Sequence, residues 1–171
     1  MNPCRVLFLC DHNASRSLMH EAVLVHEGAG RVAAYSAGRR PAAHGDPDAL
    51  DALRDADLAT AGLVPKSWHV FTGVDAPRFD IVIRVCAAPS EDECPDFAGP
   101  PVCVQWPVAR PGAAEPSVVA RAAAFRRALT QATYRVLALT QLPVETMPRD
   151  DLAAALAAIG EQFADGLADD D

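Results

Sequence analysis

Residues 4–17 read CRVLFLCDHNASRS, which is an apolar run followed at once by a polar loop. Cys4 to Leu9 are strand formers apart from Arg5, so they predict a buried strand. A helical pattern begins near Ser17. The stretch therefore predicts a strand, a loop and a helix, with the loop at the carboxyl end of the strand.

The same alternation continues along the chain. Asp46-Pro47 predicts a helix start, because Asp is a good N-cap and Pro suits the first helical position. Further strands are predicted at Val32 to Tyr35 running into Ser36-Ala37-Gly38, Phe79 to Val85 and Val102 to Trp106, and further helices at Ser117 to about Thr140 and from about Arg149. This order predicts an α/β fold, a three-layer sandwich around a four-stranded parallel sheet. We expect ligands at the carboxyl ends of the strands and the final helix packed on its own domain.

Length and composition restrict the class of protein. The 171 residues, half of them apolar, predict a single domain over residues 1–165, followed by a solvated acidic tail at residues 166–171. The net charge of −8 argues against nucleic acid and anionic membranes as partners. Neither a secretory signal nor a membrane-spanning run is recognisable, so a cytoplasmic location is expected.

The cysteines favour reactive or packing roles over metal binding. Five cysteines are unevenly spaced, without Cys-x-x-Cys or a Cys/His cluster, which predicts reduced thiols and no metal site. No cofactor is expected. Cys4 and Cys103 fall inside predicted strands and are interpreted as packing residues.

The loop after the first strand has the composition of an oxyanion site. Arg16 stands six residues after Cys10, at a helix N-terminus where backbone N–H groups and the helix dipole favour an anion. Arg16 is predicted to clamp two oxygens of that anion, and Cys10 to react as a thiolate nucleophile. The predicted oxyanion-binding residues are Asp11, His12, Asn13, Ala14, Ser15, Arg16 and Ser17.

Two loop residues have specific expected roles. Asn13 fixes the loop in a left-handed conformation, and Ser17 donates its hydroxyl to the thiolate. The alternative interpretation is that Cys10 is a small buried apolar residue and Arg16 an ordinary surface residue in the first helical turn.

A series of motifs resembles one known superfamily. They are Val6-Leu7-Phe8-Leu9-Cys10, Asn13, Arg16-Ser17, Ser36-Ala37-Gly38, Lys66-Ser67-Trp68, Phe79-Asp80-Ile81-Val82-Ile83, Cys94-Pro95 and Trp106-Pro107. In this order they resemble the low-molecular-weight protein tyrosine phosphatase and arsenate reductase superfamily over about residues 4 to 140, and the arsenate reductase branch most. The resemblance implies a phosphotyrosine phosphatase I-like fold and thiolate attack on arsenate or phosphate.

The resemblance assigns roles to two later cysteines. In the thioredoxin-linked branch, Cys86 would attack Cys10 and expel arsenite, and Cys94 would take over the disulfide for thioredoxin. Glutaredoxin with a small thiol is an alternative reductant. The segment Ala87 to Glu93 is expected to supply the flexibility that this relay needs. The other interpretation is that Cys86 belongs to the core and Cys94 is an incidental loop thiol.

One position departs from the family pattern. The family places a general-acid aspartate before a proline shortly after the tryptophan, and here Arg110 precedes Pro111. An arginine cannot give up its proton in this role, and losing such an acid removes about 10²- to 10⁴-fold in rate. Replacement acids considered are Asp11, Asp96 and Glu115, although Asp11 is expected to point away from the site. Alternatively, the loop is shifted, or Arg110 contacts substrate and makes the pocket bind anions more tightly.

Three functions remain open. The first is an arsenate reductase with Cys10, Arg16, Cys86 and Cys94 as its catalytic residues. The second is a phosphatase acting on phosphotyrosine or a small ester, which does not need the later cysteines. The third is a catalytically weakened relative that binds an oxyanion.

Overall fold

The computed structural model describes residues 2–86 and 94–163. Its elements are β1 (Cys4–Cys10), α1 (Arg16–Glu27), β2 (Val32–Gly38), α2 (Pro47–Asp55), the 3-10 helix η1 (Trp68–Phe71), β3 (Ile81–Arg84), β4 (Val102–Gln105), α3 (Val118–Thr140) and α4 (Arg149–Gln162). The strands form one sheet in the order β2-β1-β3-β4, and every neighbouring pair is parallel. The predicted α/β fold with a four-stranded parallel sheet is confirmed.

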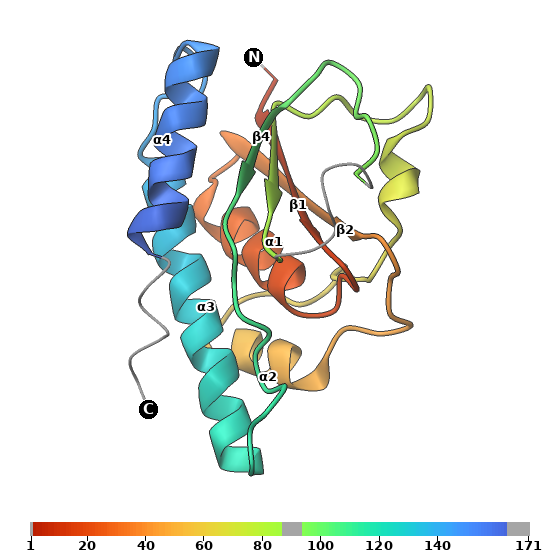
Figure 1. Ribbon diagram of the computed structural model, residues 1–171, viewed down its shortest axis with the longest axis vertical. Coiled ribbons are helices and arrows are strands. Elements are labelled where there is room, and N and C mark those ends of the chain that lie inside the picture. The colour runs from red at the N-terminus through yellow and green to blue at the C-terminus, as the bar shows by residue number, and fades with distance from the viewer. Residues whose placement is uncertain (1, 87–93, 164–171) are drawn as a thin grey trace.

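The α-helices cover one face of the sheet (Figure 1), and the sheet separates two apolar clusters. Val6, Phe8 and Ile83 face the larger cluster, which the α-helices cover. Leu7 and Val82, which alternate with them along the strands, face a smaller cluster. There the cover is η1 and loop segments, with an aromatic group of Trp68, Phe71, Phe79 and Phe97 that we call the aromatic cluster. The three layers are therefore a helical layer, the sheet and a thinner layer built around η1.

Capping residues set the predicted helix starts. Asp46 accepts a hydrogen bond from the backbone N–H of Asp48, and Pro47 is the first residue of α2. Ser117 caps α3 in the same way by accepting from the N–H of Ala120. The residue types that favour caps thus begin both helices where the sequence predicted.

The last helix packs on its own domain, as expected. Leu152, Leu156 and Ile159 are buried in the larger cluster. The indole N–H of Trp106 donates to the Leu156 carbonyl at 2.8 Å. A Cβ atom at Gly160 would lie 2.6 Å from Cδ1 of Trp106, so this contact requires a glycine. α4 therefore closes the core over the end of β4.

Two details differ from the sequence prediction. The strand predicted from Phe79 begins at Ile81, because Phe79 places its ring in the aromatic cluster. Cys103 is exposed, so its interpretation as a packing residue is wrong. It lies on edge strand β4, on the face opposite to the buried Val102 and Val104.

Two predicted segments lie outside the described residues. They are the flexible segment from Ala87 to Glu93 and the acidic tail at residues 166–171. Within the described ranges, no helix has both the length and the apolar character that a bilayer span requires.

Candidate active site

The loop after β1 meets the start of α1 at the carboxyl edge of the sheet. Four of its carbonyl oxygens accept hydrogen bonds from backbone N–H groups of the segment that follows β2. The acceptors are Cys10, Asp11, His12 and Ala14, and their donors are, in the same order, Arg39, Arg40, Ala42 and Asp46. Gly38 lies so close that a Cβ atom there would be 2.8 Å from the backbone nitrogen of Asn13. The first N–H groups of α1 have no acceptor within the helix, and a helix N-terminus of this kind suits an anion.

Cys10 is held by two hydrogen bonds within this loop. The backbone N–H of Asn13 donates to its Sγ at 3.2 Å, and the Ser17 hydroxyl lies 3.0 Å from the same sulfur. Asn13 has a φ of 48°, the left-handed conformation that the sequence analysis expected. Its side-chain amide donates to Ser17 Oγ at 2.7 Å. Because Ser17 Oγ already accepts that bond, its own proton is free to point at the sulfur, which stabilises a thiolate.

A partly buried carboxylate extends this network. The second proton of the Asn13 amide goes to Ser36 Oγ at 3.0 Å, and the Ser36 hydroxyl donates to Glu21. The backbone N–H of Lys66 donates to Asn13 Oδ1 at 3.0 Å, which fixes the orientation of the amide. Burial raises the pKa of Glu21, and its hydrogen bond with Ser36 opposes that effect. Glu21 was not predicted from the sequence, although its spacing of four residues from Ser17 places both on one face of α1.

Arg16 opens α1 and reaches across to the segment after β4. Its guanidinium donates to the Val108 carbonyl at 3.0 Å. A cavity of about 320 Å³ lies in front of it. The lining residues are Cys10, His12, Ala14, Ser15, Arg16, Asp46, Arg110, Pro111, Gly112, Ala113 and Arg121. Cys10 and Arg16 therefore share one cavity, whereas Asn13 and Ser17 are fully buried behind it.

Arg121 and Asp46 line the cavity although the sequence analysis gave neither of them a place there. Arg121, on α3, donates to Asp48 and to Asp46 Oδ2, the latter at 3.2 Å. It also donates to the Gly112 carbonyl at 3.0 Å, so it ties the start of α2 to the loop that carries Arg110. No local motif marks Arg121, because 75 residues separate it from Asp46.

Asp11 points away from the cavity, as expected. Its carboxylate accepts from Arg40 at 2.8 Å, and this bond lowers the pKa of Asp11. His12 lines the cavity and its Nδ1 lies 3.1 Å from the Arg40 carbonyl. Neither Asp96 nor Glu115 lines this cavity, and Glu115 pairs with Arg127 at 3.9 Å. None of the three replacement acids, Asp11, Asp96 and Glu115, is among the residues that line this cavity.

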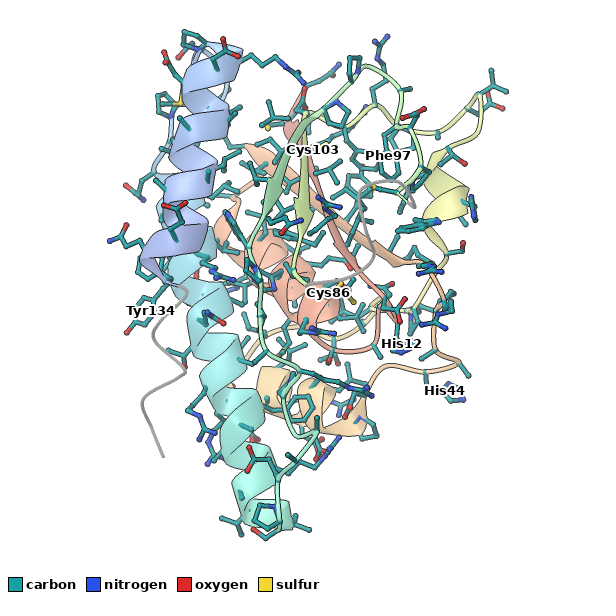
Figure 2. All side chains as sticks on the ribbon, in the orientation of Figure 1. His12, His44, Cys86, Phe97, Cys103 and Tyr134 are labelled. Carbon is teal, nitrogen blue, oxygen red and sulfur yellow. The ribbon has the colours of Figure 1, made fainter. Side chains whose placement is uncertain are left out.

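Cys86 and Cys94 lie in different surroundings. Cys86 is buried in the same apolar cluster as Cys10. It follows Val85, whose N–H donates to the Leu9 carbonyl at 2.9 Å, so it sits beside the end of β1. Figure 2 shows Cys86 and His12 toward the same end of the sheet, with Cys103 and Phe97 toward the other. Cys94 packs partly buried against the aromatic cluster, and burial raises its pKa.

The segment after β4 is fixed from behind by a buried arginine. Arg135, fully buried on α3, donates to the carbonyls of Trp106, Pro107 and Gly160 at 2.9, 3.1 and 3.1 Å. No carboxylate pairs with it within the described residues, and burial lowers its pKa to about 10. Its charge lies near the carboxyl end of α4, where the helix dipole is negative. Sequence reasoning missed Arg135, because an arginine inside a helical pattern is ordinarily on the surface.

A buried histidine supports Arg16 from the same side. Nδ1 of His20 lies 2.7 Å from the Arg16 carbonyl, and since a carbonyl only accepts, Nδ1 carries the proton. The ring packs beside Phe8 and Trp106. Burial lowers the pKa of His20 to about 4, so the imidazole is neutral at pH 7.

In the described ranges, no group of three or more His, Cys, Asp or Glu side chains is arranged to hold a metal ion. None of the five cysteines forms a disulfide.

Comparisons with solved structures agree with this fold. An arsenate reductase from Archaeoglobus fulgidus is 26% identical with a TM-score of 0.60, covering 80% of this chain and 99% of that one. A thioredoxin-dependent arsenate reductase from Corynebacterium glutamicum is 24% identical with a TM-score of 0.58, and the match spans 80% of this chain but 60% of that longer one. An arsenate reductase in its phosphate-binding state is 22% identical with a TM-score of 0.61, covering 80% and 96% of the two chains.

Family membership rests on the sequence itself. No curated protein sequence matches this chain. Residues 5–99 match the model of the low molecular weight phosphotyrosine protein phosphatases. This range is more than half of the chain and includes the whole loop from Cys10 to Ser17. The chain therefore belongs to the low molecular weight phosphotyrosine protein phosphatase family, in the superfamily that also contains arsenate reductases.

Proposed function

We propose that this protein reduces arsenate to arsenite with Cys10 as the nucleophile. The observation that carries the proposal is the double hydrogen bonding of Cys10 Sγ by Asn13 and Ser17 in a cavity that Arg16 shares. Such bonds stabilise a thiolate, and the amides at the start of α1 suit a tetrahedral oxyanion. In this proposal Arg16, which lines the same cavity, clamps that oxyanion.

The proposed reaction uses three thiols in turn. The Cys10 thiolate forms a bond to arsenic, and a hydroxide leaves arsenate. Cys86 then attacks Cys10 Sγ, so that a disulfide forms and the electron pair of the sulfur–arsenic bond stays on arsenic, which leaves as arsenite. Cys94 attacks Cys86 and regenerates the Cys10 thiolate. Thioredoxin, or glutaredoxin with a small thiol, finally reduces the Cys86–Cys94 disulfide.

The position of Cys86 favours reduction over ester hydrolysis. It shares the apolar cluster of Cys10 and sits beside the end of β1. Arg110 in place of the family's acid does not separate the two reactions, because an ester leaving group and the hydroxide that leaves arsenate both need a proton donor. The Corynebacterium glutamicum neighbour is a thioredoxin-dependent arsenate reductase, which supports thioredoxin as the partner to test first.

Arsenite production by the purified protein tests the proposal. Arsenate is supplied with a thioredoxin system or with glutaredoxin and glutathione. Turnover is expected with one of the two systems, and Cys10→Ser and Cys86→Ala should each abolish it. Cys103→Ala is the matched control, because Cys103 is an exposed cysteine on the edge strand. Turnover that survives in Cys86→Ala would overturn the relay.

Phosphatase activity is the second candidate, and family membership is the observation that favours it. Hydrolysis of p-nitrophenyl phosphate that requires Cys10 but is unchanged in Cys86→Ala, together with no arsenite production, would support it. Phosphate binding without either activity would support the third possibility, an oxyanion-binding relative.

A further inference from the structure

The cavity in front of Cys10 is larger than a bare oxyanion requires. Its volume of about 320 Å³ falls within the range of about 300–1,000 Å³ that is usual for small-molecule sites. A tetrahedral oxyanion held by Arg16 fills only the end next to Cys10. The remaining space extends to the loop at residues 110–113 and to Arg121.

Two of the three arginines that line this cavity already have partners. Arg121 bonds to both Asp46 and Asp48, so its charge is balanced. Arg16 donates to the Val108 carbonyl and stands where the oxyanion is proposed to bind. Neither of them has a charge left for a second anionic group.

Arg110 is different. In the part of the chain that the structure describes, its exposed guanidinium has no hydrogen bond or ion pair. The nearby carboxylates are already engaged. Asp46 caps α2 through Oδ1 and pairs with Arg121 through Oδ2. Glu115 lines a neighbouring hollow that Arg110 also borders, and it pairs with Arg127 at 3.9 Å.

An unpaired arginine in a concave site of an acidic protein is suited to bind an anionic ligand. The chain carries a net charge of −8, so its general field disfavours anions and a local cation must hold them. Guanidinium groups bind carboxylates and phosphates in bidentate geometry. The site thus offers one anion position next to Cys10 and a second one at Arg110.

We propose that Arg110 forms a second anion subsite, which binds a carboxylate or phosphate group of a small molecule while the Cys10 loop holds a tetrahedral oxyanion. The inference rests on the proposed function and adds a substrate class to it. The second group belongs either to the molecule that carries the oxyanion or to a separate small molecule, such as an acidic thiol.

Calorimetry with two probes on the reduced protein tests the subsite. Phosphonoacetate joins a tetrahedral oxyanion to a carboxylate, and inorganic phosphate lacks the carboxylate. We expect phosphonoacetate to bind about tenfold more tightly than phosphate, as one charge-assisted contact gives. Arg110→Ala should bring the ratio of the two affinities to about 1. Arg126→Ala removes the same charge from an exposed position on α3 outside the cavity, and should keep the wild-type ratio.

A second arm identifies the source of the anion. If the carboxylate comes from a separate molecule, excess acetate should strengthen phosphate binding, again only while Arg110 is present. Tighter binding of phosphonoacetate, or tighter binding of phosphate when acetate is present, supports the subsite if the increase in affinity requires Arg110. The probe that shows the increase tells whether the carboxylate belongs to the molecule with the oxyanion or to a separate one. Equal affinities for phosphate and phosphonoacetate with no effect of acetate would overturn it.

The test separates this inference from the proposed function. A protein that does not bind phosphate at all would refute the oxyanion site itself. If the protein binds phosphate and produces arsenite, but no increase in affinity depends on Arg110, only the second subsite would be refuted.

Discussion

Two walls of one cavity are built in different ways. The loop from Cys10 to Ser17 is fixed by its own hydrogen bonds and by its neighbours at the end of β2. The segment from Trp106 to Gly112 follows β4 and belongs to no helix or strand. Arg135 donates to the carbonyl of Trp106 at its start, and Arg121 donates to the carbonyl of Gly112 at its end. The first wall is therefore fixed mainly near the β1–α1 junction, whereas the second depends on side chains of α3.

This difference explains how the second wall can change without the first. Arg110 is one exposed side chain and takes no part in the hydrogen bonds around Cys10. The bond from Arg16 to the Val108 carbonyl joins the two walls. Substitutions in each wall, and at the contact between Arg16 and Val108, should therefore have separable effects.

The largest effect on activity is expected at Arg16, whose side chain joins the two walls. Arg16→Lys keeps the charge but loses the planar fork and its reach to Val108. Loss of a preorganised oxyanion donor costs about 10²- to 10³-fold in rate, and we expect a loss of that size in kcat/KM for arsenate. Steady-state arsenite production measures it. A loss below about threefold would show that the two walls do not depend on this side chain.

Removing the support behind the second wall should lower stability. Arg135→Met leaves three carbonyls without their donor, two of them in buried contacts, which is expected to cost about 3–4 kcal/mol in the free energy of unfolding. Urea unfolding measures the change. Arg126→Met, at an exposed position on the same helix, serves as the control and should change the free energy by about 0.5 kcal/mol or less. Equal effects of both substitutions would contradict the role of Arg135.

His20 predicts a pH dependence of stability. Because burial lowers its pKa from 6.5 to about 4, the unfolded chain binds a proton in this interval that the folded protein does not. The free energy of unfolding should be highest above pH 6.5 and fall toward pH 4, with about 3 kcal/mol of the loss due to His20. His20→Asn should show a smaller decrease over the same interval. Parallel curves for the two proteins would mean that His20 does not titrate in this way.

The smallest effect is expected within the first wall. Ser17→Ala removes one hydrogen bond to Cys10 but leaves the N–H of Asn13 in place. Since one hydrogen bond contributes about 1 kcal/mol, alkylation of Cys10 by iodoacetamide at pH 7 should slow about fivefold. Ser17→Thr, which keeps the hydroxyl, should restore most of the rate if it folds. An unchanged rate in Ser17→Ala would show that the hydroxyl does not stabilise the thiolate.

Local sequence patterns predicted much of the fold and half of the site. The apolar run at Cys4 to Leu9, the cap at Asp46 and the stripe of the last helix all led to the elements that the structure contains. Cys103 was misassigned, because a strand pattern does not say which face an edge strand leaves uncovered. Asp11 pointing away from the cavity and the left-handed Asn13 followed from the chemistry of those residue types.

By itself, the sequence determined the position of a thiol, the polar loop after it and an arginine, because all three lie within eight consecutive residues at one strand–helix junction. The tertiary structure alone decided what surrounds them. Glu21 enters the Cys10 network through Ser36, and Arg121 meets Asp46 across 75 residues of chain. Such partners depend on how helices pack over the sheet, and no periodicity or spacing along the chain encodes a contact between side chains that far apart.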